Sequence, residues 1–223
     1  MAIYHLHNKI ISRADGRSSV GAAAYRAGEC LTNERDGRVH DYTRKGNVEH
    51  SEILTPDNAP EWTKNRGTLW NEVEKIEKNI DAQLCRELEM ALPAELTLEQ
   101  QKELVRDFAK ELVDQGAIID ASFHYPPGNP HAHLLMTMRA LDKDGQWMAK
   151  QKKEYILDKN GQKQYDPIKK TYKCKTVKMT NWDDPETLKK WRENWEKAVN
   201  RHLERAGHET RIDHRSLEAQ GIE

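Results

Sequence analysis

The sequence is poor in cysteine. Cys30, Cys85 and Cys174 are its three cysteines in 223 residues, and they are widely spaced, with no CxxC pair. A set that is both odd and scattered argues against a disulfide framework and against a zinc–thiolate site. We therefore expect a reducing compartment.

Long apolar runs and a charge excess are also missing. No stretch approaches the ~18 consecutive apolar residues that a membrane span needs, and the opening residues do not form a signal peptide. We expect a cytoplasmic protein without membrane insertion. The formal net charge is only −1, so any argument for a nucleic-acid partner must rest on local charge.

Periodic apolar residues predict an α+β fold. Period-two alternation predicts strands at 2–12, 84–92, 117–125 and 131–139, and residues 30–54 resemble a charged hairpin around Asp36-Gly37. Helical spacing with capping residues predicts helices at about 18–28, 62–80, 97–116 and 186–206. We expect a central antiparallel sheet with helices packed on one face. The length suits a single domain, 1–223.

Residues 140–180 differ from the rest of the chain. They hold eleven lysines against five acidic residues, a net of +6, with little apolar periodicity. This basic insertion or flexible finger is the one local charge signal for a polyanion. The candidate DNA-contacting lysines are Lys150, Lys152, Lys153, Lys169 and Lys170. The alternative is a solvated insertion without a ligand.

Three histidines are expected to meet in the hairpin formed by residues 117–125 and 131–139. His131 and His133 are at i and i+2, so they project from the same face of a strand. The short turn at 126–130 brings His124 opposite or diagonal to them. Three protein ligands with open positions left over are typical of a catalytic metal site. Imidazoles alone suit zinc, nickel or cobalt better than magnesium.

Two acids and a tyrosine leave alternatives open. Glu87 and Glu89 share the polar face of a predicted strand, where one could orient a histidine or accept a proton, or both could simply be solvated. Tyr25 lies among alanines in a predicted helix and is either an interface aromatic or a nucleophile. Arg26 beside it supplies a charge suited to a phosphate.

These residues carry a resemblance. His131-Ala132-His133 is the His–hydrophobe–His motif of the HUH endonucleases. The segments MAIYHLHNKIISRADGRSS, AAYRAG, RELEMALP, NPHAHLLMTMR and HLERAGHETRIDHRSLEAQGIE resemble the MobA/MobL type of conjugative relaxase. The resemblance covers nearly the whole chain in ordered blocks and is weakest at 140–180.

The resemblance implies a set of roles. Tyr25 is the catalytic tyrosine, Glu87 the active-site carboxylate, and His124, His131 and His133 the ligands of one divalent metal ion, Mg²⁺ or Mn²⁺ in function. His5 matches a family position of undefined role. The resemblance also implies an HUH relaxase fold. Family members usually continue into further domains, so this chain is expected to be an N-terminal fragment.

The implied activity is strand-specific nicking at a plasmid origin of transfer. It forms a 5′-phosphotyrosine link on single-stranded DNA, with an adjacent hairpin, relaxosome accessory proteins and a type IV secretion system as partners. Tyr42, in the charged hairpin, is the other serious candidate nucleophile. The alternatives are an HUH rolling-circle replication initiator, a metal-dependent nuclease that uses water, and a DNA-binding module without activity.

Overall fold

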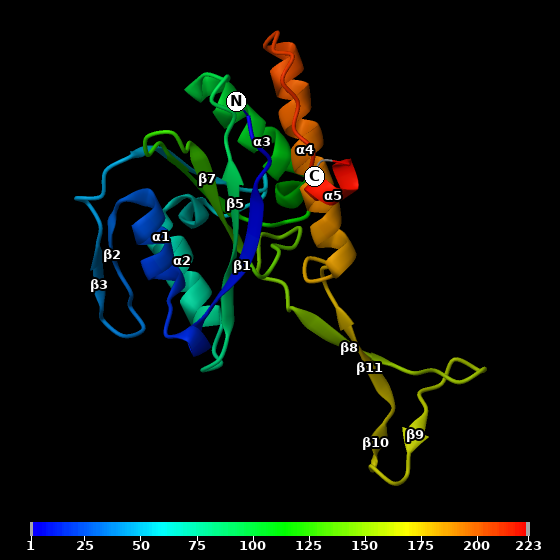
Figure 1. Cartoon of the computed structure of the whole chain (residues 1–223). Helices are drawn as coiled ribbons and strands as arrows, with labels where there is room; N and C mark the ends of the chain where they lie inside the picture. Colours follow the sequence, from blue (N-terminus) through cyan, green and yellow to red (C-terminus); the bar gives the residue numbers. More distant parts are fainter. Residues whose placement is uncertain (1, 222–223) are drawn as a thin grey trace.

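A five-stranded antiparallel sheet organises the computed structural model, which describes residues 2–221 (Figure 1). Its neighbouring strands, in order, are β1 (Leu6–Ser12), β5 (Gln83–Ala91), β7 (His131–Thr137), β6 (Ile119–His124) and β4 (Val48–Leu54). Every neighbouring pair is antiparallel. The predicted α+β class with a central antiparallel sheet is confirmed.

One face of the sheet is covered by α3 (Leu98–Asp114) and α4 (Pro185–Arg205). Alternation along β5 turns Leu88 and Met90 toward these helices, where both are fully buried. Phe108 and Trp195 meet edge to face between the two helices, with ring centroids 5.4 Å apart. The larger of the two apolar cores lies here.

The opposite face is only partly covered, by α1 (Ser19–Ala27) and α2 (Arg66–Ile76). Cys85 and Leu135 pack there against Ala23 and Trp70 in a second apolar cluster. Helices therefore lie on both faces, which corrects the expectation of one covered face. Both helices were predicted from their spacing, but the face of the sheet that each covers depends on long-range packing, which no local pattern encodes. The uncovered part of this face carries the predicted histidines.

Local sequence signals account for the helix ends. The Ser18 hydroxyl accepts a hydrogen bond from Gly21 N at 2.9 Å and begins α1. Gly28 ends it at φ 68°, a left-handed conformation that suits glycine. Thr97 and Gln100 form the predicted capping box of α3. Two short 3-10 helices, Arg13–Asp15 and Glu61–Lys64, precede α1 and α2.

The predicted hairpin at 30–54 is only partly correct. β2 (Cys30–Thr32) and β3 (Val39–Asp41) form a small hairpin around Gly37. Residues 48–54 instead form the edge strand β4 of the main sheet, paired with β6. The charged and polar residues of β4 hid its strand character, because an edge strand needs only one partner and no continuous apolar face.

Within residues 140–180, the segment 151–178 forms an arm that projects from the body (Figure 1), whereas Leu141 and Trp147 pack against the second apolar cluster. β8 (Gln151–Tyr155) pairs with β11 (Cys174–Lys178), and β9 (Tyr165–Asp166) pairs with β10 (Thr171–Tyr172). These strands were not predicted, because mostly exposed residues leave no alternating pattern. A short helix, α5 (Leu217–Gln220), follows α4. No helix in the described part of the chain has the length and apolarity to cross a bilayer.

Candidate active site

Strand pairing brings the three histidines together. In the β6–β7 ladder His124 pairs directly with His131, and His133 pairs with Ser122. The ring centroids of His124 and His133 lie 4.7 Å apart, those of His131 and His133 lie 5.0 Å apart, and those of His124 and His131 lie 5.3 Å apart. One ring nitrogen from each lies within 4.8 Å of the others. The predicted convergence is therefore present.

Each imidazole is oriented by a partner that can only accept a hydrogen bond. Nδ1 of His133 donates to Glu87 at 2.7 Å. Nδ1 of His131 donates to the carbonyl of Asn129 at 2.8 Å, and Nε2 of His124 donates to the carbonyl of Arg26 at 2.7 Å. The proton must lie on the donating nitrogen, so the other nitrogen of each ring keeps its lone pair. This is the arrangement of metal-ligating histidines, so the residues fit a divalent ion.

Burial favours the neutral form of two of these rings. It lowers the pKa of His124 to about 4. Burial also lowers the pKa of His133, although the hydrogen bond to Glu87 and its charge act in the opposite direction. Because only a neutral imidazole binds a metal, these two residues are ready to ligate at neutral pH.

Glu87 is completely buried beneath the histidines. Burial would raise its pKa, but hydrogen bonds from His133 and Arg26 and contacts with Lys9 hold it well below the usual range. Arg26 Nη2 donates to Glu87 Oε2 at 2.6 Å, and Lys9 Nζ lies 2.9 Å from the same oxygen. The carboxylate is therefore ionised and engaged. Glu89 is more exposed, and its Oε2 lies 4.0 Å from His133 Nδ1.

The side chain of Arg26 points inward. Only 5% of its surface is exposed, and its guanidinium also donates to the carbonyl of Ala22 at 3.2 Å. Its charge is therefore matched by Glu87 before any ligand arrives. The contact with a DNA phosphate that we expected for Arg26 stays a prediction. Its contact with Glu87 could not be read from the sequence, because 61 residues separate the two.

Tyr25 lies at the surface of α1, and 46% of its side chain is exposed. Its ring meets that of Tyr42 edge to face at 5.1 Å. Both tyrosines and all three histidines line one cleft of about 920 Å³. The cleft therefore contains the predicted nucleophile, its one competitor and the predicted metal ligands. Tyr125 instead points into the opposite core, where its hydroxyl contacts Gln101.

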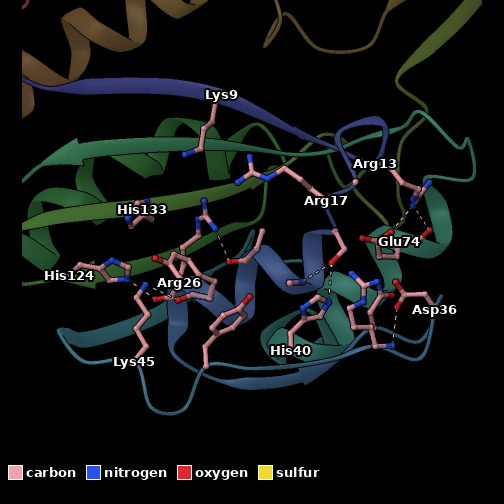
Figure 2. A pocket seen from close by; sticks show the side chains of 18 of the residues that line it. Lys9, Arg13, Arg17, Arg26, Asp36, His40, Lys45, Glu74, His124 and His133 are labelled. Atoms are coloured by element: carbon pink, nitrogen blue, oxygen red, sulfur yellow. Dashed lines mark hydrogen bonds and ion pairs between the residues drawn. The ribbon is translucent and has the colours of Figure 1, made fainter.

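The cleft is rich in cations that sequence analysis did not single out. Figure 2 shows Lys45 and Arg26 near His124 and His133, and Arg13 with Glu74 farther along the cleft. The missed cations are Lys9, Arg13, Arg17, Arg35, Arg38 and Lys45. They come from β1, the β2–β3 hairpin and the turns beside them, so no local run of charge marks them. Only the alternation of β1, which turns Lys9 toward Glu87, could have indicated one of them.

The lysines proposed in the arm differ in their surroundings. Lys150 Nζ lies 3.0 Å from Glu77, and Lys152 Nζ lies 2.9 Å from Glu154. Within residues 2–221, no carboxylate lies within 4.0 Å of the side-chain Nζ of Lys153, Lys169 or Lys170. These last three are the stronger candidates for a polyanion. DNA contact by all five stays a prediction.

His5 lies outside the histidine cluster. Its ring stacks loosely on that of His7, with centroids 6.5 Å apart. Its carbonyl accepts a hydrogen bond from Ala91 N at 3.2 Å, which extends the pairing of β1 with β5. The contacts of His5 are therefore structural, and they assign it no chemical role.

Residues 17–223 match the sequence model of the MobA/MobL family. The chain belongs to the MobA/MobL family. Mobilization protein MobL of Acidithiobacillus ferridurans is 40% identical to it over the whole chain, which spans 60% of that relative's length. The predicted family resemblance is confirmed.

Two solved structures share the fold. One, described as "Molecular Basis of Vancomycin Resistance Transfer in Staphylococcus aureus", is 32% identical, with a TM-score of 0.81 over 96% of this chain and 100% of that one. The other is the conjugative relaxase TrwC in complex with mutant OriT DNA. It is 13% identical, with a TM-score of 0.52 over 94% of this MobA/MobL chain and 72% of TrwC, and it indicates a common fold only.

Proposed function

We propose that this chain is the relaxase domain of a mobilisation protein, which nicks one DNA strand at an origin of transfer and remains covalently attached to it through Tyr25. The observation that carries the proposal is the shared cleft. It joins an exposed tyrosine, three imidazoles with free ring nitrogens and a series of cations. Membership of the MobA/MobL family supports the same role.

His124, His131 and His133 are the proposed ligands of one divalent ion. The donor set and the anchored rings fit such an ion. When bound there, Mg²⁺ or Mn²⁺ would supply polarisation of a non-bridging phosphate oxygen. Zinc, nickel and cobalt also suit three imidazoles. Glu87 has the role of orienting His133, because its ionised carboxylate is already engaged by three donors.

The proposed reaction is a transesterification. The hydroxyl oxygen of Tyr25 attacks phosphorus, a bond forms between them, and the bond from phosphorus to the 3′ oxygen breaks. The tyrosine loses its proton, and the departing 3′ oxygen gains one. One phosphodiester replaces another, so the 5′-phosphotyrosine link conserves the bond energy and the strand can be rejoined.

Single-stranded DNA at the origin of transfer, with an adjacent hairpin, is the proposed substrate. The cleft cations give the phosphate backbone a path beside Tyr25, and the arm lysines offer a second contact region. Relaxosome accessory proteins and a type IV secretion system are the proposed partners of the whole protein. We also propose that the chain is one domain of a longer, cytoplasmic protein.

The test is to incubate the protein with 3′-end-labelled single-stranded oligonucleotides of origin-of-transfer, replication-origin and random sequence, with Mn²⁺ or with EDTA. A metal-dependent adduct that survives denaturing electrophoresis is the expected result. Cleaved DNA without an adduct would indicate a nuclease that uses water. Binding without cleavage would indicate a DNA-binding module. Adducts formed only with a replication origin would indicate a replication initiator.

A further inference from the structure

Lys45 has a place in the cleft that neither its sequence context nor the family motifs mark. We propose that Lys45 is a positioning residue for Tyr25, whose ammonium group holds the phenol ring and stabilises the negative charge that develops when its oxygen attacks a phosphate. This inference rests on the proposed function. It adds to the three histidines and Glu87 a residue that acts on the nucleophile itself.

Two contacts tie Lys45 to Tyr25. Its Nζ lies 3.8 Å from the centroid of the Tyr25 ring, over the face of the ring. The same nitrogen donates a hydrogen bond to the Tyr25 carbonyl at 2.8 Å. A cation over an aromatic face is attracted by the negative face of the ring. Together the two contacts restrict both the ring and the end of α1 that carries it.

The turn that carries Lys45 is itself well defined. The backbone nitrogen of Lys45 donates to the carbonyl of Tyr42 at 2.9 Å. Asn47, two residues later, has a φ of 64°, and its carbonyl accepts a hydrogen bond from Tyr125 N at 2.8 Å. This hydrogen bond joins the turn to the end of β6, at the residue that follows His124. This links the position of Lys45 to the strand that carries a proposed metal ligand.

The charge of Lys45 has no direct counter-ion. Among residues 2–221, no carboxylate lies within 4.0 Å of its Nζ. Burial and the charge of Arg26 lower the pKa of Lys45 to about 8, and the charge of Glu87 partly opposes them. His124 also faces the lysine. Arg26 is matched by Glu87, which leaves Lys45 as the unmatched cation beside the tyrosine and ready for an anion.

The contacts argue for an effect of charge and against proton transfer by Lys45. Its Nζ lies over the ring and is bonded to the Tyr25 carbonyl, and no hydrogen bond joins it to the Tyr25 hydroxyl in the described part of the chain. In the proposed step the phenol proton therefore leaves to solvent, and Lys45 keeps its own proton. A fixed positive charge over the ring that carries the reacting oxygen favours the more negative transition state.

The test compares single-turnover adduct formation at saturating origin DNA and Mn²⁺ in wild type, Lys45→Met and Lys45→Arg. Arg44→Met is the matched control, because it removes a positive charge from an exposed neighbour in the same turn. At neutral pH we expect Lys45→Met to be roughly ten-fold slower than wild type. Lys45→Arg should keep most of the rate, since guanidinium also stacks on aromatic rings.

The pH profile separates an effect of charge from a structural one. The ratio of the wild-type rate to the Lys45→Met rate should fall toward one above pH 8, where the wild-type lysine loses its proton. The ratio of Lys45→Arg to Lys45→Met should stay constant, because arginine does not titrate there. Titration of groups whose pKa does not depend on the charge at residue 45 cancels in these ratios.

The possible failures can be distinguished. If wild type forms an adduct and Lys45→Met matches Arg44→Met at every pH, the role of Lys45 is refuted while the proposed function stands. The role of Lys45 is also refuted if Lys45→Met and Lys45→Arg are equally slower than wild type, by a factor that does not change with pH. If wild type forms no adduct with any origin sequence, both proposals are overturned.

Discussion

The buried carboxylate of Glu87 accepts a hydrogen bond from Nδ1 of His133 at 2.7 Å. The same carboxylate is bonded to Arg26, whose carbonyl anchors His124. Two of the three proposed metal ligands are thus oriented by one ion pair between β5 and α1. A substitution at Glu87 should therefore change both the stability of the fold and the metal affinity of the histidine cluster.

Glu87→Gln tests this relationship. We expect the affinity for Mn²⁺ to fall about 10–100-fold, because His133 is no longer oriented and polarised by a carboxylate. The free energy of unfolding should fall by about 3–5 kcal/mol, because Arg26 loses its buried counter-charge. Calorimetry and thermal unfolding measure the two effects. Glu89→Gln is the control, and it should change both much less, since Glu89 is partly exposed.

Nicking by Glu87→Gln supplies a second readout. We expect adduct formation to fall with metal affinity, while single-stranded DNA binding stays near the wild-type level. Unchanged nicking across a pH series would contradict a role for Glu87. Nicking that is lost even at saturating Mn²⁺, with the fold intact, would indicate instead that Glu87 takes part more directly than by orienting His133.

The metal prediction is best tested at His131. It is the least buried of the three histidines, so His131→Ala should leave the fold nearly intact. We expect the affinity for Mn²⁺ to fall at least about 100-fold, because two remaining ligands cannot fix the geometry. Addition of Mn²⁺ should raise the Tm of wild type and not that of the variant. An equal rise in both would remove His131 from the ligand set. His7→Ala, outside the cluster, is the control.

Much of this site followed from strand periodicity. Alternation placed His131 and His133 on one face, and the short turn placed His124 beside them, because both rules depend on a few neighbouring residues. Alternation also put Glu87 on the polar face of its own strand, and the pairing of β5 with β7 in the structure places that face beside the histidines.

The remainder of the site depends on long-range contacts. Lys45 reaches Tyr25 through a turn whose position is set by β6, and Arg26 meets Glu87 across 61 residues. No local pattern encodes such pairs. β4 was missed for a similar reason, since its place at the sheet edge comes from pairing with β6 and not from its own apolar alternation. The arm strands also lack a buried face.

The low pKa of His124 predicts that the metal-free protein loses stability in mild acid. In the folded state the pKa is about 4, below the ordinary value of 6.5. Between these values the unfolded chain binds more protons, so the free energy of unfolding falls as the pH falls from about 6.5 to 4. The contribution is about 3 kcal/mol. Urea titrations should show a shallower pH dependence for His124→Gln, and equal slopes would contradict the assignment.

The arm prediction concerns its unpaired lysines. Replacing Lys153, Lys169 and Lys170 with Gln should weaken binding to origin DNA at low salt and reduce the salt slope by roughly 0.7 for each phosphate that is no longer neutralised. Lys152→Gln is the control, because Glu154 already neutralises this lysine. Replacing residues 151–178 with a short Gly-Ser linker should have a larger effect. Equal affinity with and without the arm at low salt would show that it is a solvated insertion.

Tyr25→Phe tests the nucleophile. The substitution removes one oxygen from a half-exposed side chain, so we expect the fold, Mn²⁺ affinity and DNA affinity to survive. Nicking and the covalent adduct should both disappear, because no other oxygen occupies that position. Tyr42→Phe is the matched control, since Tyr42 contacts the Tyr25 ring and lines the same cleft. It should retain the adduct, with at most a modest loss of rate.

Mass spectrometry of the wild-type adduct decides between the two tyrosines. After digestion of protein and DNA, the nucleotide should be found on the peptide that contains Tyr25. Both contacts from Lys45 are made with Tyr25, whereas the ring of Tyr42 packs edge to face against the ring of Tyr25. A nucleotide on Tyr42 or on another residue would overturn the assignment of the nucleophile. The inference about Lys45 would fall with it, while the proposed metal site would remain.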